Sequence, residues 1–199
     1  MCLRSPIALL LVGQVFCSSA QLTLLDPTFG NAGIVQQGLN GFGGDRANDV
    51  SMMPDGRVVV AATSGGQEGA MVVMRILENG VLDNSFNGTG IADVNFGSTS
   101  SGEAIALQAD GRIVVAGSAF FEGSFDDLAF ARFKENGALD TSFSEDGRLT
   151  VTRSGAADAV LSLTVASDGR IVAGGKFDGP VGDMAAVQLL ANGTLDPSF

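Results

Sequence analysis

The sequence predicts an all-β protein made of tandem four-stranded antiparallel repeats. The first observation is a five-residue motif, Leu-Asp-x-Ser/Thr-Phe, which we call the clasp motif and which ends at Phe29, Phe86, Phe143 and Phe199. Its spacings of 57, 57 and 56 residues are typical of a modular array. The second observation is an Asp-Gly pair between apolar runs in every repeat, which is a strong β-hairpin signal. These pairs are Asp55-Gly56, Asp110-Gly111 and Asp168-Gly169.

Each repeat contains four short strand-like runs. The first runs are 33–36, 90–94 and 147–151, and the second runs are 50–52, 105–107 and 161–165. The third runs are 57–61, 112–116 and 170–174, and the fourth runs are 71–75, 128–132 and 184–188. The third runs follow the Asp-Gly pairs, for which we expect type I′ turns, and their continuous apolar character predicts strands buried on both faces. The fourth runs are followed by Asn-Gly pairs, which favour a further turn.

Four antiparallel strands per unit is the pattern of a β-propeller blade, so the sequence predicts a partial β-propeller of three blades. A β-solenoid has shorter coils without hairpin turns, and 57 residues is short for a β-sandwich. We divide the chain into a signal segment at 1–20, repeats at 21–81, 82–138 and 139–194, and the start of an incomplete fourth repeat at 195–199.

The repeat resembles the delta-60 repeat of bacterial exported and cell-surface proteins. The middle unit carries the resemblance most fully, through Asp110-Gly111-Arg112-Ile113-Val114-Val115-Ala116-Gly117 and Phe130-Ala131-Arg132-Phe133. The first unit departs from the pattern at Ala62, where a glycine is expected, and the third at Gln188, where an arginine is expected. The resemblance covers residues 22–199. It implies propeller-like repeats outside the cytoplasm and supplies no catalytic residues.

The first 20 residues have the pattern of a secretory signal. Arg4 supplies a positive charge, residues 6–16 form an apolar run too short for a membrane span, and Ser18-Ser19-Ala20 resembles a cleavage site. We therefore expect an exported mature protein that starts at Gln21, lies in the periplasm, at the cell surface or outside the cell, and has no membrane span. A retained membrane anchor is the alternative.

Composition excludes several chemistries. The chain has no His, Trp or Tyr, and both cysteines, Cys2 and Cys17, lie in the signal segment. Histidine-based triads, His-ligated metals and thiolate catalysis are therefore excluded from the mature chain. Without Arg4, ten basic residues face 22 acidic ones, a net charge of −12, which disfavours nucleic acid and anionic membranes. We predict no cofactor and no metal.

We interpret the clasp motif as a structural element. Its Leu and Phe are expected to be buried between units, while its Asp and its Ser or Thr bind backbone N–H groups nearby. A recurring calcium site built from the four motif aspartates is the alternative, although one carboxylate per repeat supplies few ligands.

The candidate ligand-binding residues lie in the loop between the third and fourth runs of the middle repeat: Phe120, Phe121, Glu122, Phe125, Asp126 and Asp127. Aromatic rings beside carboxylates suit sugars or cations, whereas aromatics packed beneath the loop would be structural. Arg57, Arg112 and Arg170 form either an anion-binding ring or solvated hairpin ends. For Arg75 and Arg132 we expect ion pairs between blades, with a place in the channel lining as the alternative.

We predict a non-catalytic exported scaffold that binds an unknown protein or carbohydrate, or that has a structural role. A propeller-type hydrolase or lyase acting on sugars or peptides would need paired carboxylates, for which Asp93, Glu103, Asp126 and Asp127 are the candidates. Three blades do not close a ring. We therefore expect a homodimer with six blades, a fragment of a longer repeat protein, or a small fold closed by its own terminal motifs.

Overall fold

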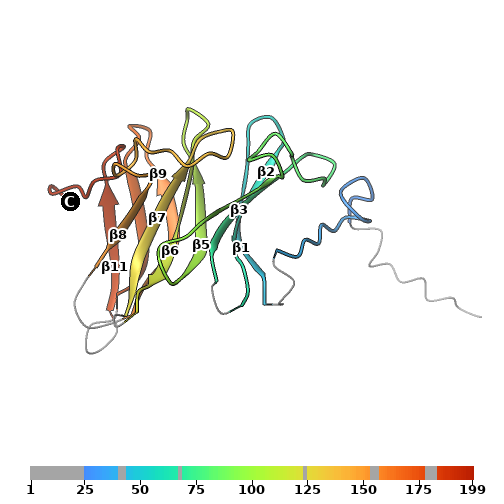
Figure 1. Ribbon diagram of the computed structural model, residues 1–199. Coiled ribbons are helices and arrows are strands. Elements are labelled where there is room, and N and C mark those ends of the chain that lie inside the picture. Colours follow the sequence, from blue (N-terminus) through green and yellow to red (C-terminus); the bar gives the residue numbers. More distant parts are fainter. Residues whose placement is uncertain (1–24, 40–43, 67–68, 123–124, 153–156, 178–182) are drawn as a thin grey trace, which may run out of the picture.

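The computed structural model describes residues 25–39, 44–66, 69–122, 125–152, 157–177 and 183–199. Three antiparallel sheets lie side by side in chain order, and no helix is present among these residues (Figure 1). They are three blades of a partial β-propeller, as the sequence predicts. None of the described residues forms a helix able to cross a membrane. The predicted signal segment, residues 1–20, lies outside the described residues.

The first sheet contains β1 (Arg46–Met52), β2 (Val58–Thr63), β3 (Met71–Ile76) and β4 (Ile91–Val94), in that spatial order. The second contains β5 (Thr99–Leu107), β6 (Ile113–Phe120), β7 (Asp126–Phe133) and β8 (Arg148–Val151). The third contains β9 (Asp158–Val165), β10 (Ile171–Phe177) and β11 (Asp183–Leu189). Strand β5 contacts both β1 and β9, so the first strands of the three sheets are their inner strands.

The sheets are offset from the sequence repeats by one strand. The first run of the middle repeat becomes β4, the outer strand of the first sheet, and that of the third repeat becomes β8 in the second sheet. The corresponding run at 33–36 forms only an isolated bridge through Ile34, so the strand predicted there is not formed. Among the described residues, no third strand lies beside it for pairing. The two internal clasp motifs, 82–86 and 139–143, therefore lie within a sheet, between its third and fourth strands.

The hairpin turns differ from the predicted type. Gly56 has a φ of 85°, but Asp55 does not have positive φ, as a type I′ turn requires. The N–H of Met53 instead donates to the carbonyl of Arg57 and that of Gly56 to Met53, which makes a three-residue connection. Gly111 and Gly169 repeat this pattern. Because the Asp55 carboxylate accepts the N–H of Arg57, the Asp of each pair caps the turn instead of taking a left-handed conformation.

The hydrophobic core lies between the sheets. Val59, Val73 and Ile105 belong to a cluster that joins the first and second sheets, and Val114, Phe130 and Ile171 to one that joins the second and third. The central strands β2 and β6 are buried on both faces, as predicted. Strand β10 alternates between buried and partly exposed residues, since no sheet in the described chain covers its far face.

Candidate functional site

The clasp motif is a compact turn that buries its phenylalanine between two sheets. In the motif at 82–86, one carboxylate oxygen of Asp83 accepts the N–H of Ser85 at 3.0 Å and its hydroxyl at 2.6 Å. Phe86 and Phe143, which end the two internal motifs, have no exposed surface. Burial of one such ring contributes roughly 1.5–3 kcal/mol. The predicted structural role of the motif is confirmed at these two positions.

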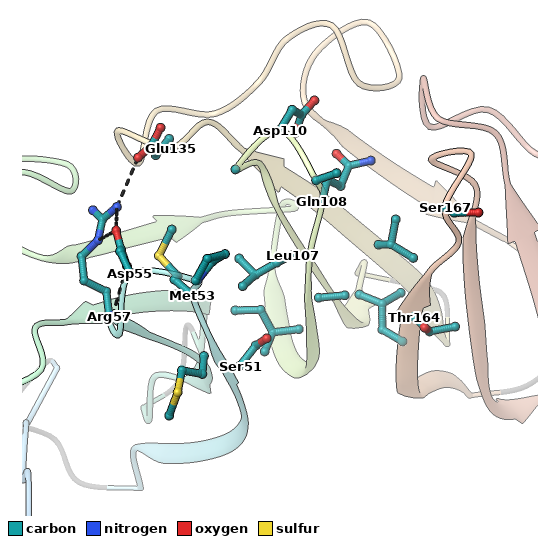
Figure 2. Close-up of a pocket in the computed structure, with 18 of the residues that line it drawn as sticks. Ser51, Met53, Asp55, Arg57, Leu107, Gln108, Asp110, Glu135, Thr164 and Ser167 are labelled. Carbon is teal, nitrogen blue, oxygen red and sulfur yellow. Dashed lines mark hydrogen bonds and ion pairs between the residues drawn. The ribbon is translucent and has the colours of Figure 1, made fainter.

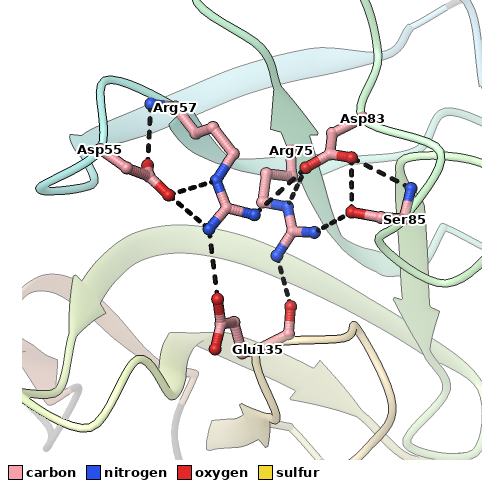
Figure 3. Close-up of polar contacts among 6 residues, drawn as sticks. All are labelled: Asp55, Arg57, Arg75, Asp83, Ser85 and Glu135. Atoms are coloured by element: carbon pink, nitrogen blue, oxygen red, sulfur yellow. Dashed lines mark hydrogen bonds and ion pairs between the residues drawn. The ribbon is translucent and has the colours of Figure 1, made fainter.

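Arg75 of β3 connects the clasp motif at 82–86 to the second sheet (Figure 3). Its Nε lies 2.8 Å from the second carboxylate oxygen of Asp83, and its Nη2 donates to the Ser85 hydroxyl at 2.8 Å. Its Nη1 donates to the backbone carbonyl of Glu135, in the turn after β7. The guanidinium also lies 4.8 Å from the centre of the Phe86 ring, within cation–π range. One buried arginine thus holds a turn and the neighbouring blade together.

The clasp motif at 139–143 repeats this arrangement. Arg132 of β7 lies 2.8 Å from the carboxylate of Asp140, donates to the Ser142 hydroxyl at 3.1 Å and reaches the carbonyl of Ala191 in the third sheet's turn at 2.5 Å. Its guanidinium lies 4.9 Å from the centre of the Phe143 ring. The ion pairs were expected between blades, but each forms within one blade, Arg75 with Asp83 and Arg132 with Asp140. The same arginines bridge the blades through hydrogen bonds to carbonyls.

The clasp motif at 195–199 has no arginine partner on the preceding strand. Gln188 takes its place in β11 and donates to the carboxylate of Asp196 at 2.6 Å. A glutamine amide is too short to reach a further blade as well, and it carries no charge. Phe199 is 66% exposed, so this motif forms its turn but its phenylalanine is not buried.

The arginines that follow the Asp-Gly pairs are engaged with carboxylates. Arg57 lies 3.3 Å from Asp83 and 3.2 Å from Glu135, and it also bonds Asp55. Arg112 pairs with Asp110 and Asp140, and Arg170 with Asp168. These pairs neutralise the arginines, so the geometry favours hairpin ends over an anion-binding ring.

The buried motif carboxylates stay charged. Burial alone would raise the pKa of Asp83, but hydrogen bonds from Ser85 and Arg57, together with the charge of Arg75, outweigh it and set the pKa at about 2. Opposing effects of the same kind leave the pKa of Asp140 below its ordinary value. Burial and the charge of Arg57 lower the pKa of Arg75, yet a guanidinium remains protonated at neutral pH.

A groove of about 880 Å³ runs across the inner strands of all three sheets (Figure 2). Its wall is apolar and polar in equal parts, with Met52, Met53, Leu107 and Leu163 on the apolar side and hydroxyl groups from Ser51, Thr164 and Ser167 on the polar side. Asp55, Arg57, Asp110 and Glu135 lie at one end of it. None of the described residues that line it is aromatic. Sequence reasoning missed this groove, although the exposed apolar residues of β1 just before the Asp-Gly pair are a usable signal.

The predicted ligand-binding loop lies at the opposite ends of the strands. Phe121 is half-buried and packs on the cluster between the first two sheets, and Phe120 is half-buried at the end of β6. Asp127 is buried and accepts a hydrogen bond from Thr152 at 2.9 Å. Phe125 and Glu122 are exposed, and Asp126 is partly exposed. Phe120, Phe121 and Asp127 are thus at least half-buried, whereas Glu122, Phe125 and Asp126 lie at least partly at the surface.

The other candidate carboxylates lie on separate strands. Asp93 is exposed on β4, and Glu103 on β5 lies 3.7 Å from Arg46. Asp126 and Asp127 are at the start of β7. In the part of the chain that the structure describes, no group of three or more acidic residues is arranged to hold a metal ion. The motif aspartates bind the residues of their own turns, and Asp83 and Asp140 also bind arginines.

Comparison with known proteins identifies the repeat. A model of the family described as "Domain of unknown function (DUF5122) beta-propeller" matches residues 54–86, 108–143 and 166–199, just over half of the chain. Each match extends from an Asp-Gly hairpin to the phenylalanine of the next clasp motif. No curated protein matches the sequence. The chain belongs to this β-propeller repeat family.

Proposed function

We propose that this protein is an exported, non-catalytic scaffold that binds a polypeptide segment in the groove along its inner strands. The observation that carries the proposal is the groove itself, because three blades contribute to one wall that presents both apolar side chains and hydrogen-bonding groups. The charged groups at its end are already in ion pairs, Arg57 with Asp55 and Glu135, and Asp110 with Arg112, which leaves them unsuited to acid–base chemistry.

The composition of the groove indicates the class of ligand. Aliphatic and methionine side chains adapt to varied apolar partners, and hydroxyl groups supply hydrogen bonds. Asp55, Asp110 and Glu135 outnumber Arg57 at its end, so the local charge is negative. An extended segment with apolar side chains and neutral or positive neighbours suits this surface better than a sugar, for which an aromatic platform is the usual support.

Binding is tested with three fluorescent decapeptides that alternate leucine with lysine, glutamine or glutamate. Fluorescence anisotropy should give the order Lys above Gln above Glu. Met52→Glu should weaken binding of the glutamine peptide at least tenfold. This residue is 72% exposed, so the substitution leaves the core intact.

Phe125→Ala is the matched control, since Phe125 is exposed on the loop at the far ends of the strands. If Phe125→Ala weakens binding and Met52→Glu does not, the loop is the binding site. If none of the three peptides binds, the proposed ligand class is wrong.

Export is tested separately. The resemblance to the delta-60 repeat and the signal pattern of residues 1–20 support it. Expressed in a bacterium with a Sec pathway, the protein recovered outside the cytoplasm should begin at Gln21. An intact N-terminus in the cytoplasmic fraction would contradict export.

A further inference from the structure

The third sheet has an unpaired edge. In the first two sheets the fourth strand begins five residues after the clasp phenylalanine, as β4 does after Phe86 and β8 after Phe143. Among the described residues the third sheet has only β9, β10 and β11, so the outer edge of β11 carries no strand. An open edge of this kind is a template for strand addition.

The far face of the third sheet is also uncovered. The strand registers make Val172, Gly174, Met184 and Ala186 equivalent to Val114, Ala116, Leu128 and Phe130 of the second sheet. Those four residues of the second sheet are buried against the third sheet, whereas Met184 is 94% exposed. The third sheet thus presents the same apolar face, and no blade among the described residues covers it.

The complementary surface is at the other end of the same chain. Phe29, Val35 and Leu39 cover the outer face of the first sheet, packing on Val60 and Val72 among others. Figure 1 shows this blue segment beside the first sheet, at the end opposite the C-terminus.

The segment lies where the outer strand of a preceding blade would be. The N–H of Gly30 donates to the carbonyl of Asn79 at 2.8 Å. Asn87 bonds Asn136, and Ser144 bonds Asn192, at the same distance in the two internal blade contacts. By its distance from Phe29, Ile34–Gln37 is the equivalent of β4 and β8.

We propose that a second copy of this chain completes the third sheet, with Ile34–Gln37 of one copy pairing along the open edge of β11 of the other. The registers of β3 with β4 and of β7 with β8 place Ile34 opposite Val187, Val35 opposite Ala186, Gln36 opposite Ala185 and Gln37 opposite Met184. The occupant is a second copy because the contact needed is one that the chain already makes twice internally. Two copies supply six blades, within the usual range for a closed propeller.

The terminal clasp motifs compete in such a contact. Residues 195–199 of the accepting copy and 25–29 of the donating copy are equivalent, so only one of them can occupy the clasp position at this contact. The N-terminal motif is the better anchored, through the Gly30–Asn79 bond and the packing of Phe29, whereas Leu195 and Phe199 are exposed. The C-terminal motif is therefore the one that is displaced.

Gln188 makes this contact weaker than the internal ones. An arginine at this position reaches the neighbouring turn, as Arg75 reaches Glu135 and Arg132 reaches Ala191. The equivalent carbonyl in the partner is that of Glu78. Gln188→Arg should therefore tighten the association, by at least fivefold in Kd.

The pairing is tested by a disulfide across it. Gln36→Cys and Ala185→Cys are introduced together in a chain whose Cys2 and Cys17 are serine. The bonding pattern of β3 with β4, in which the N–H of Arg75 donates to Gly90, makes this pair a non-hydrogen-bonded one, the type with the closest side chains. Mild oxidation should give a covalent dimer on a non-reducing gel, and each single-cysteine variant should give much less.

Two surface substitutions distinguish the proposed contact from non-specific association. Met184→Lys should abolish the dimer product, while Val81→Lys, on a turn residue that is also exposed, should leave it unchanged. A ladder of higher products from the same cysteine pair supports the strand contact and shows that the ring stays open. A monomer that does not cross-link at about 100 µM overturns the proposal, as does a dimer insensitive to Met184→Lys. Peptide binding in the groove of a single copy does not depend on this result.

Discussion

At the scale of single residues, each contact between two blades depends on one arginine in each internal clasp motif. Arg75 and Arg132 each satisfy a carboxylate, a hydroxyl and a carbonyl of the next blade while stacking on a buried phenylalanine. A buried ion pair is costly unless its remaining hydrogen bonds are also made, and here they are. The strength of the contact comes from the complete network.

Arg132→Gln should destabilise the protein by about 2–4 kcal/mol, since it leaves the buried Asp140 carboxylate without its charged partner on β7. Arg170→Gln removes an exposed partner of Asp168 and should cost less than about 1 kcal/mol. Urea unfolding followed by circular dichroism measures both. Equal losses of unfolding free energy in the two variants would show that the buried clasp network stabilises the protein no more than an exposed ion pair does.

The clasp also makes stability depend on pH. The folded pKa of Asp83 is about 2, against an unfolded value of about 3.9, so folding favours the charged form. The resulting stabilisation, on the order of 2 kcal/mol, is fully present above about pH 5 and is lost as the pH falls through 4 towards 2. Asp83→Asn should flatten this part of the profile, measured as unfolding free energy against pH.

Glu122→Gln serves as the matched control, because Glu122 is exposed at the far loop. Its pH profile should follow that of the unmodified protein. A profile for Asp83→Asn as steep as that of the control would show that other carboxylates govern acid unfolding.

At the scale of strands, two adjacent glycines of β10 have different roles. A methyl group on Gly175 would lie 2.0 Å from the carbonyl oxygen of Ala159, at the bulge between β9 and β10, whereas one on Gly174 would meet nothing within 4 Å. Gly175→Ala should therefore cost about 1–3 kcal/mol, and Gly174→Ala should gain a few tenths to 1 kcal/mol. Thermal unfolding of the two variants side by side measures the difference. Gly175→Ala as stable as Gly174→Ala would refute the role of the close contact.

Local sequence signals predicted which segments form strands and where the hairpins turn. The Asp-Gly pairs and the continuous apolar runs are local features, and β2 and β6 are buried as those runs require. The assignment of 33–36 as a strand was wrong because strand formation there depends on a partner, which its equivalents 91–94 and 148–151 find in β3 and β7. The turn type was also missed, since backbone bonds around Asp55 and Gly56 settle it.

The candidate site was less predictable than the fold. A charge within an apolar strand predicted that Arg75 and Arg132 link blades, but the link is a hydrogen bond to a carbonyl instead of the expected ion pair. The groove did not follow, because residues such as Met52, Leu107 and Leu163 come from three repeats and meet only when the inner strands converge. The sequence also did not show which loop residues would pack against the core: Phe121 does so, whereas Phe125 is exposed.

At the scale of the whole molecule, three blades leave two complementary ends. In the described part of the chain, one end has the segment Ile34–Gln37 with no third strand beside it, and the other has the open edge of β11. The net charge of −12 predicted for the mature chain opposes association of two copies, so screening by salt should strengthen it. Association is therefore best measured near 0.15 M salt, where the Debye length is about 8 Å.

The central claim is that an equivalent blade of a second copy covers the open end, and the solution mass of the purified protein tests it most directly. Light scattering after size-exclusion chromatography should give twice the mass of one chain, falling to one chain's mass for Met184→Lys and remaining double for Val81→Lys. A single-chain mass for the unmodified protein across micromolar concentrations would contradict the account.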